Sequence, residues 1–489
     1  MNQAPARTLF GQPAGLAVVF LTEMWERLSF YGMRALLILF LVDQVAHGGL
    51  GLTDRSAAAI YGLYVGGTYL ACLPGGWIGD RLSGSQRAVL YGGIVIALGH
   101  LILGLAPSAA SFFFGLFVIV IGTGLLKPNA GAIVAQLYPE GGARRDVGFT
   151  IYYVGVNVGA TLGPLVAGLL AQRYGWPAGF MTAAVGMTLG VLQFVGGRRL
   201  LDGAGAKPCG TVSRSVTRWL LLATGLLAVL VALVWAGIVP IDPLSLVDLS
   251  TAAVIAMMVL YFAYLLLGAG LTRVERRRVY AVIVLFAASV LFWAGYEQTG
   301  SSLNLFAERY TDRHLWGWEV PASWLQSLNP IYIVVFGPLL SWLWLGLARR
   351  RREPPTTLKF VAGLLAMASG FAVMALASSL VLGGHRVGMG WLSITFLLHT
   401  WGELSLSPVG LSAVSKLVPA RFVSQSLGVF FVSISVGNLL AGRIAGGFDP
   451  NNLAAMPGQY LFIFWFGAIT AGVLLALLPL MRRWSAGAD

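Results

Sequence analysis

Long apolar stretches, separated by short polar or basic segments, run along the whole chain. Each is close to the roughly 20 residues that a helix needs to cross a bilayer. Fourteen such segments are present, with approximate cores at residues 15–42, 56–79, 87–106, 110–138, 147–172, 178–197, 218–240, 248–270, 279–308, 323–348, 358–383, 388–417, 423–447 and 457–481. The pattern predicts an all-α integral membrane protein with fourteen transmembrane helices.

The composition supports the same class of protein. Of 489 residues, 57% are hydrophobic and only 10% are charged, against roughly 25% charged residues in soluble domains. A soluble enzyme and a disordered chain are thereby excluded, and the net charge of +13 is better explained by basic membrane loops than by nucleic-acid binding. Cys72 lies in an apolar stretch and Cys209 in a basic loop, so we expect no disulfide and no metal site.

The distribution of Lys and Arg predicts the orientation of the helices. If the N-terminus is cytoplasmic, 23 of the 32 basic residues fall in cytoplasmic segments, six on the opposite side and three within spans. Cytoplasmic loops are enriched in Lys and Arg. The N-terminus has no obvious cleavage site, so we expect it to be retained, with both termini in the cytoplasm of a bacterial inner membrane.

Two basic stretches, at 198–218 and 273–278, flank the seventh and eighth apolar segments. The first contains Gly203-Ala-Gly-Ala, which is typical of a linker, and residues 219–270 carry no charge except Asp242 and Asp248. Removing this pair of helices leaves six spans on each side, a plan typical of transporters built from two pseudo-symmetric halves. We therefore expect a six-helix bundle at 1–200, a linker with two inserted helices at 201–278, and a second six-helix bundle at 279–489.

Some charged residues fall within the predicted spans, where each costs about 2.5–3.5 kcal/mol if it has no partner. Such residues pair with one another or line a wet cavity. Seven stand out: Glu23, Glu26, Arg27, Arg34, Lys127, Glu297 and Glu403. Their sum is −1, so that binding of one proton would neutralise the set.

The first span has the densest cluster of these charges. At about 100° per residue, Glu23, Arg27, Tyr31 and Arg34 share one face of a helix, with Glu26 beside them. A proton-coupling role and a static ion-pair network that locks helices together are both compatible with this stripe.

The remaining buried ionisable residues also leave two interpretations open. Lys127, which precedes Pro128, either stays deep within its segment or extends its side chain to an interface. Glu297 and Glu403 are lone acids among apolar and aromatic residues, where burial and a nearby cation would act in opposite directions on protonation. Each is a proton carrier or a permanently neutral packing residue. His100 and His399 are more consistent with packing than with proton transfer.

Four ordered motifs are similar to those of the proton-dependent oligopeptide transporter family, within the major facilitator superfamily. They are Glu23-Met-Trp-Glu26-Arg27-Leu-Ser-Phe-Tyr31, the glycine-rich Gly75–Gly84 loop, Tyr152-Tyr153-Val-Gly-Val-Asn157-Val-Gly159, and Gly402-Glu403-Leu-Ser-Leu-Ser407-Pro408-Val-Gly410. Leu28 and Phe30 depart from the first family motif, and Phe430 stands where many relatives carry a tryptophan. The two inserted helices also resemble bacterial members of the family.

This resemblance implies a proton-coupled symporter that imports di- and tripeptides by alternating access, as a monomer and with no cofactor beyond the proton. The residues that it assigns to proton coupling are Glu23, Glu26, Arg27, Lys127 and Glu297. The residues that it assigns to substrate binding are Tyr31, Arg34, Tyr69, Lys127, Asn157, Trp293, Asn329, Glu403 and Ser407. A peptide zwitterion needs an acid, cations and amide groups, and Glu403, Arg34, Lys127 and the two asparagines provide them.

Two other classes of function are weighed against peptide transport. One is a proton-coupled carrier for another small solute, such as nitrate, an amino acid or a drug, because one fold serves many substrates. The other is a membrane enzyme or a structural channel. The sequence has no nucleophile–base pair, metal-ligand set or phosphate loop, so we expect that the protein is not an enzyme.

Overall fold

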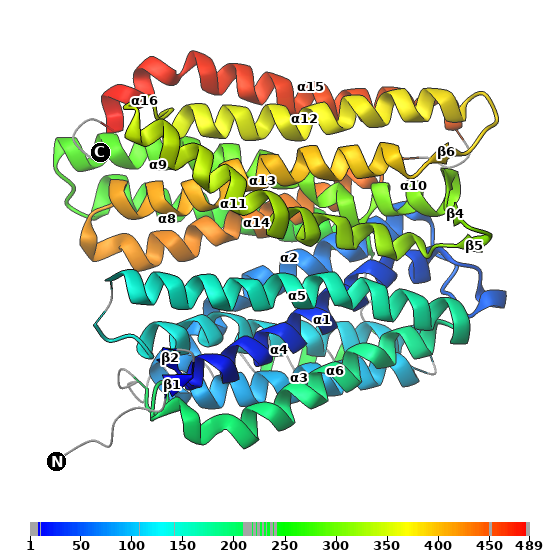
Figure 1. Ribbon diagram of the computed structural model, residues 1–489, viewed down its shortest axis with the longest axis horizontal. Coiled ribbons are helices and arrows are strands. Elements are labelled where there is room, and N and C mark those ends of the chain that lie inside the picture. Colours follow the sequence, from blue (N-terminus) through cyan, green and yellow to red (C-terminus); the bar gives the residue numbers. More distant parts are fainter. Residues whose placement is uncertain are drawn as a thin grey trace. The chain divides into compact units, whose positions relative to one another are not determined.

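The computed structural model of the chain consists mainly of long helices (Figure 1). It describes residues 8–9, 11–106, 108–140, 142–208, 242–448 and 452–485, with isolated positions between 218 and 238. The long helices are α1 (Gly15–Val42), α2 (Asp54–Ile78), α3 (Ser85–Leu105), α4 (Ala109–Gln136), α5 (Gly142–Tyr174), α6 (Trp176–Gly197), α8 (Pro243–Ala263), α9 (Arg273–Tyr296), α11 (Leu328–Arg349), α12 (Thr356–Val381), α13 (Gly390–Leu417), α14 (Val423–Ala445) and α15 (Met456–Ala476). The span predicted at 218–240 lies almost wholly outside the described residues.

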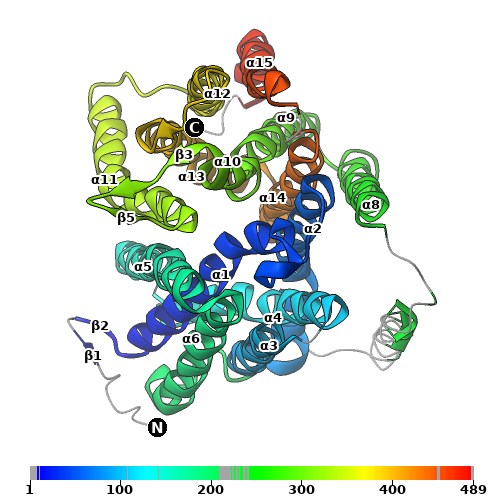
Figure 2. The same cartoon turned by 90° about the vertical axis from the view of Figure 1, so that its right-hand side faces the viewer.

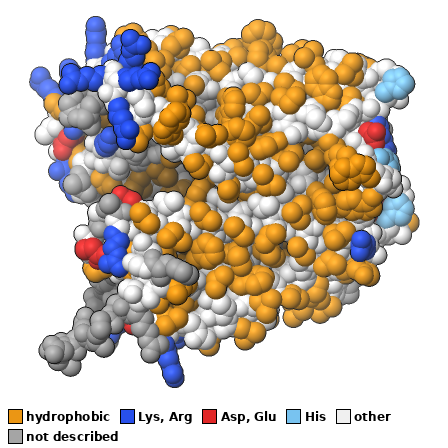
Figure 3. Space-filling model, viewed as in Figure 1, with side chains coloured by type: hydrophobic (Ala, Val, Ile, Leu, Met, Phe, Trp, Pro, Cys, Tyr) orange, Lys and Arg blue, Asp and Glu red, His pale blue; other side chains and the backbone are white. Residues whose placement is uncertain are grey.

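The membrane spans agree with the apolar pattern of the sequence. In the described part of the chain, eleven helices are long and apolar enough to cross a membrane. Helices α1 and α13 are equally long, but they carry the acids and other polar residues of the predicted site. These thirteen helices correspond to thirteen of the fourteen predicted spans, and the remaining one, 218–240, lies almost wholly outside the described residues. In each unit, apolar side chains cover the middle of the visible surface, and Lys and Arg gather toward one end (Figure 3).

Short strands and helices complete the described structure. The strands form two-stranded pairs: β1 (Thr8–Leu9) with β2 (Gln12–Pro13) and β4 (His314–Leu315) with β5 (Trp318–Glu319), both antiparallel, and β3 (Thr311–Asp312) with β6 (Val387–Gly388), parallel. Two short helices are also present: α10 (Ser302–Tyr310) directly precedes β3, and α16 (Leu478–Ser485) follows α15.

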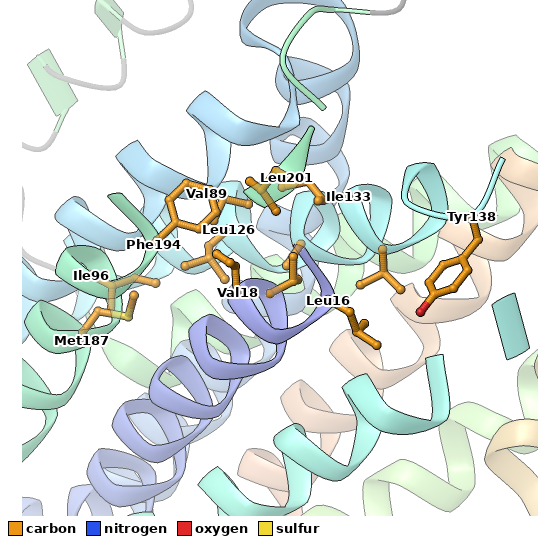
Figure 4. Close-up of a cluster of buried hydrophobic side chains, with 13 residues drawn as sticks. Leu16, Val18, Val89, Ile96, Leu126, Ile133, Tyr138, Met187, Phe194 and Leu201 are labelled. Carbon is orange, nitrogen blue, oxygen red and sulfur yellow. The ribbon is translucent and has the colours of Figure 1, made fainter. Parts of the chain in front are cut away.

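The chain divides into two compact units, residues 1–36 with 67–246 and residues 37–66 with 247–489. In the first unit, α3 packs along α4 and α6, and α5 packs on α6. A cluster of buried apolar side chains lies among α1, α3, α4 and α6, and it includes Val18, Leu126, Phe194 and Leu201 (Figure 4). Leu201 is fully buried although it follows the end of α6.

The Gly203-Ala-Gly-Ala segment, at the start of the expected linker, is packed against the first unit. The backbone amide of Gln86 donates to Gly205 O at 2.9 Å, and the Gln86 side chain donates to Ala204 O at 2.8 Å. Gly205 N in turn donates to Gln136 Oε1 at 2.7 Å. These bonds attach residues 201–206 to the ends of α3 and α4, because the backbone groups of the segment find partners there rather than in water.

Replacing Gly205 by alanine is expected to destabilise the first unit. Its φ of +72° is strained for any other residue, and a Cβ atom would lie 3.0 Å from Ile133 Cγ1 and Ser85 Cβ. Gly203 has a similar φ of +81° with nothing within 4 Å of a Cβ, so it is a matched control for backbone strain. We expect Gly205→Ala to cost about 1–3 kcal/mol more than Gly203→Ala, measured as a lower thermal unfolding temperature in detergent. Equal temperatures for the two variants would show that the segment does not pack as described.

In the second unit, α12 packs against α13 and α15, and α9 packs against α14. This unit also holds the first half of α2. A Cβ atom on Gly62 would lie 2.7 Å from Asn438 O, and one on Gly442 would lie 2.7 Å from Ala58 O. The backbones of α2 and α14 can approach this closely because both glycines lack a side chain. At the start of α2, both carboxylate oxygens of Asp54 accept hydrogen bonds from the Arg309 guanidinium, at 2.5 and 2.8 Å.

The described inserted helix, α8, lies at the edge of the second unit, beside α9 and α14 (Figure 2). The Tyr261 hydroxyl is 3.0 Å from Ser426 Oγ, Phe262 contacts Phe286 edge to face, and Arg443 forms an ion pair with Asp248 at 3.4 Å. Only 22% of its apolar stretch is buried. Within the second unit α8 is therefore peripheral, and the other expected inserted helix, 218–240, lies almost wholly outside the described residues.

The ninth predicted span is not one continuous helix. Helix α9 ends at Tyr296, a 3₁₀ turn covers Glu297–Gly300, and α10 begins at Ser302. A Cβ atom on Gly300 would lie 1.6 Å from the Tyr61 hydroxyl oxygen, so α2 fills the space beside the break. The sequence predicted a single span at 279–308 because apolar residues continue through the turn. Broken helices in transporters occur where backbone lines a binding site.

Candidate functional site

The acids of α1 flank one buried arginine. Arg27 Nε lies 2.8 Å from Glu23 Oε1 and 2.8 Å from Glu26 Oε2. All three residues are at most 2% exposed. The predicted stripe is present, because residues four apart on a helix face the same side, and Glu26 reaches the same guanidinium from the next position.

The two acids differ in their other partners. The Tyr152 hydroxyl of α5 donates to Glu23 Oε2 at 2.7 Å, so each oxygen of Glu23 has a donor. Glu26 has its ion pair with Arg27, but among the described residues neither of its oxygens accepts a well-aligned hydrogen bond. Hydrogen bonds to a carboxylate stabilise its ionised form. Glu23 therefore has a donor at each carboxylate oxygen, while Glu26 is the acid whose charge is less well compensated.

Two further cations of the first unit rest against aromatic rings. Lys127 Nζ lies 3.8 Å from the centroid of the Tyr69 ring, and Arg34 Cζ lies 5.7 Å from that of Tyr31. Such contacts compensate a cation in a dry environment without neutralising it. Lys127 is also close enough to Glu26 and Arg27 to experience their charges. These neighbours disagree with a lysine that extends to the membrane interface.

The helix that carries Lys127 is fixed by a residue that the sequence analysis missed. Asn129 donates from Nδ2 to Gly75 O at 3.0 Å and to Leu125 O at 2.8 Å. Leu125 is one turn before Asn129, at the point where Pro128 interrupts the helix hydrogen bonds. Asn129 thereby joins α4 to the glycine-rich end of α2. The sequence feature that could have pointed to Asn129 is its position two residues after Lys127.

Asn157 is buried on α5, and its Nδ2 donates to Tyr153 O of the same helix at 2.9 Å. Tyr152, the partner of Glu23, lies in the same quoted motif. The motif therefore supplies Tyr152, which donates to Glu23 of α1, and Asn157, whose amide donates to the backbone of its own helix.

In the second unit, three helices meet at Glu403 of α13. The Tyr296 hydroxyl of α9 donates to Glu403 Oε2 at 2.7 Å, and Asn329 Nδ2 of α11 donates to the same oxygen at 3.1 Å. Asn329 also donates to Thr400 Oγ1 at 3.0 Å, and Thr400 donates to Phe396 O at 2.7 Å. Thr400 thus fixes the side-chain amide of Asn329, which donates to Glu403. Neither Tyr296 nor Thr400 was predicted, although Tyr296 adjoins Glu297 and Thr400 is three residues before Glu403 in the sequence.

The other predicted residues of this unit lie near the same helices. Trp293 packs edge to face on Tyr296, with ring centroids 5.1 Å apart. Ser407 follows Glu403 by one turn of α13 and is half-buried. Glu297 is 2% exposed and begins the break between α9 and α10.

The buried histidines are consistent with packing. His100 and His399 are both at most 1% exposed, and the His399 ring lies 4.9 Å from that of Phe371. Among the described residues, no cluster of three or more His, Cys, Asp or Glu could hold a metal ion.

The predicted site residues therefore form two groups, one in each unit. The first group comprises Glu23, Glu26, Arg27, Tyr31, Arg34, Tyr69, Lys127 and Asn157; the second comprises Trp293, Glu297, Asn329, Glu403 and Ser407. The first contains every predicted cation, and the second contains only acids, an amide, a hydroxyl and an indole. The first is suited to an anionic group of a ligand and the second to a cationic one.

Membrane helices with compensated buried charges and two six-helix bundles define a transporter of the major facilitator type. The POT family model matches residues 86–461, and the chain belongs to this family. It is thus a peptide transporter rather than an enzyme, and the alternatives of nitrate, amino-acid or drug transport are not supported.

Three relatives illustrate how far the similarity extends. The chain is 41% identical to the peptide transporter YePEPT of Yersinia enterocolitica, over 99% of this chain and 97% of the relative. It is 33% identical to a di-/tripeptide transporter of Lactococcus lactis subsp. cremoris, over 97% of each chain. A crystal structure of a POT peptide transporter in complex with alafosfalin matches with a TM-score of 0.91 and 36% identity, covering 99% of this chain and 98% of the other.

Proposed function

We propose that the protein imports di- and tripeptides together with protons, by alternating access, across a bacterial inner membrane. The observation that carries this proposal is the buried Glu23–Arg27–Glu26 cluster, in which one acid has two donors and the other has only its ion pair. An ion-pair network that only held helices together would not need one acid to have more hydrogen-bond donors than the other. The family membership supports the same function.

In the proposed mechanism, Glu26 is the acid of α1 that binds the coupling proton. Glu23 keeps its ion pair with Arg27 and its hydrogen bond from Tyr152. Protonation of Glu26 removes a negative charge close to Lys127, so the ammonium becomes available for the carboxylate of a peptide. The two states then differ by a few kcal/mol, which a ligand and a proton can bias.

In the proposed substrate site, Glu403 binds the amino terminus of the peptide, with Asn329 and Asn157 as amide partners of the backbone. Arg34 and Lys127 bind the carboxyl terminus. Tyr31, Tyr69, Trp293 and Ser407 shape the pockets for side chains, where water accommodates their differences. These residues need no cofactor, and the proton is the coupling ion.

We also propose the organisation of the chain in the membrane. Residues 1–200 and 279–489 would form the two bundles, and 201–278 would join them, with 201–206 packed on the first. Both termini would lie in the cytoplasm, as the excess of Lys and Arg in that set of loops favours. The protein would function as a monomer.

Uptake by proteoliposomes tests this function. Purified protein would be reconstituted, and labelled dialanine uptake would be followed with and without an inward proton gradient. We expect accumulation above the outside concentration only with the gradient, and competition by unlabelled di- and tripeptides. Competition by nitrate or by free alanine alone, without competition by peptides, would overturn the proposal.

Glu297→Gln is expected to weaken proton-driven accumulation several-fold while peptide exchange continues. Glutamine has almost the same shape but cannot exchange a proton, and the residue lies at the break between α9 and α10. The measurement compares gradient-driven uptake with counterflow of labelled dialanine in the same vesicles. Glu308→Gln, which removes a half-exposed acid eleven residues further along the second unit, is the control. Accumulation equal to that of the parent would remove Glu297 from the coupling residues.

A further inference from the structure

An apolar groove of about 380 Å³ runs between α3 and α6 on the first unit. The small residues Ala97 and Ala184 line it between larger apolar side chains, among them Leu98 and Val185, which are 51% and 55% exposed. The hydroxyl of Thr188, which also lines the groove, donates to Ala184 O of its own helix at 2.7 Å. The groove therefore presents no unbonded polar group of these residues to a ligand, and it has the character of a site for a hydrocarbon chain.

Each wall of the groove leads along its helix to an exposed arginine. On α3, Arg87 is seven residues before Ile94 of the groove, which places both on the same face. On α6, the exposed residues Leu192 and Val195 continue from the groove toward Arg199. The two helix ends lie together, because Arg198 Nε donates to Gln86 Oε1 at 2.8 Å. Arg87 follows Gln86 in the chain and Arg199 follows Arg198, so both arginines lie at the same end of the groove.

We infer that this groove binds an acyl chain of an anionic phospholipid, whose phosphate contacts Arg87 and Arg199. The dimensions agree: residue 101 lies about 21 Å along α3 from residue 87 at 1.5 Å per residue, and half a bilayer with its headgroup region measures about 20–22 Å. Exposed arginines at one end of an apolar groove complement a molecule with an anionic head and a hydrocarbon tail. A zwitterionic lipid lacks the net charge that two arginines select. The site is separate from the proposed peptide site and does not depend on the identity of the substrate.

Photo-crosslinking in lipid nanodiscs tests the site with the intact protein. The probes are phosphatidylglycerol and phosphatidylcholine, each with the same diazirine-bearing acyl chain, and labelled peptides are mapped by mass spectrometry. We expect labelling of 94–101 and 181–191, with phosphatidylglycerol preferred about 25-fold, because each of the two surface arginines contributes about fivefold. Raising the salt concentration should reduce this preference.

Two variants separate the head from the tail. Arg87→Ala/Arg199→Ala should abolish the preference for phosphatidylglycerol while labelling of the groove by phosphatidylcholine persists. Thr188→Trp fills the groove from an exposed position and should reduce labelling by both lipids. Arg349→Ala/Arg350→Ala removes two exposed arginines from the second unit and should change neither.

Several results would overturn the inference. They are equal labelling of the groove by the two lipids, a preference that survives the double arginine variant, and labelling that falls outside α3 and α6. A crosslink from the groove to residues 209–241 or to a second copy of the chain would show that protein occupies it instead.

Discussion

Glu26→Gln is expected to abolish proton-driven accumulation of peptide while exchange of peptide continues. One proton moving down a gradient of one pH unit supplies about 1.4 kcal/mol, enough for about tenfold accumulation. A glutamine at this position cannot carry the proton, so the accumulation ratio should fall to one. Glutamine is uncharged, as protonated Glu26 is, and the ion pair between Arg27 and Glu23 remains. Counterflow of labelled dialanine should therefore persist.

The comparison with Glu23→Gln makes this prediction specific. Glu23 accepts from both Arg27 and Tyr152, so its substitution removes the better-bonded of two counter-ions and should lower the free energy of unfolding by about 1–3 kcal/mol. Thermal unfolding in detergent should show a lower temperature for Glu23→Gln than for Glu26→Gln. Tyr152→Phe removes only one donor and should fall between Glu23→Gln and the parent. If Glu26→Gln accumulates peptide like the parent, Glu26 is not the coupling acid.

Glu403→Gln is expected to weaken binding of a peptide with a free amino terminus by on the order of 10²- to 10³-fold, because the ammonium loses its charged partner. The amide at position 403 could still bond to Tyr296 and Asn329, so the helices that meet there should stay together. Affinity is measured by competition against a labelled peptide in detergent or vesicles.

Acetylation of the peptide provides the matching change in the substrate. The parent should bind dialanine on the order of 10²-fold or more tightly than N-acetyl-dialanine, and Glu403→Gln should bind both about equally weakly. Thr400→Val, which removes the hydroxyl that fixes Asn329, should give a smaller loss of the same kind. Discrimination against the acetylated peptide that survives Glu403→Gln would place the amino terminus elsewhere.

Much of the fold follows from the apolar pattern alone. A helix in lipid must satisfy its own backbone hydrogen bonds, so the long apolar stretches predict helices, and the bounds of α1, α12 and α13 differ from the prediction by only a few residues. The pairing of Arg27 with Glu23 was also accessible, because spacing on a helix determines which side chains share a face.

Other features depend on contacts between distant residues, which spacing along one helix does not contain. The break after Tyr296 is accompanied by Tyr61, more than two hundred residues earlier, filling the space beside Gly300. The difference in hydrogen bonding between Glu23 and Glu26 depends on Tyr152 of another helix, which donates to Glu23. The Gly203–Ala206 segment has the composition of a linker, but its partners Gln86 and Gln136 give its backbone fixed hydrogen bonds. A local pattern cannot distinguish a loop that packs from one that does not.

The packing of α2 on α14 has a consequence for biosynthesis. Gly62 meets its partner only when residues near Gly442 have been made, about 380 residues later, and Asp54 meets Arg309 only after about 255. At about 5–20 residues per second, the first of these delays lasts roughly 20–80 s. During this time the first half of α2 is in the membrane with a glycine-lined face uncovered and a carboxylate without its guanidinium. Nascent chains that stop before α14 should therefore be substrates for membrane quality control, and pulse–chase proteolysis of chains truncated at 420 and at 448 would show the longer one gaining protection of α2.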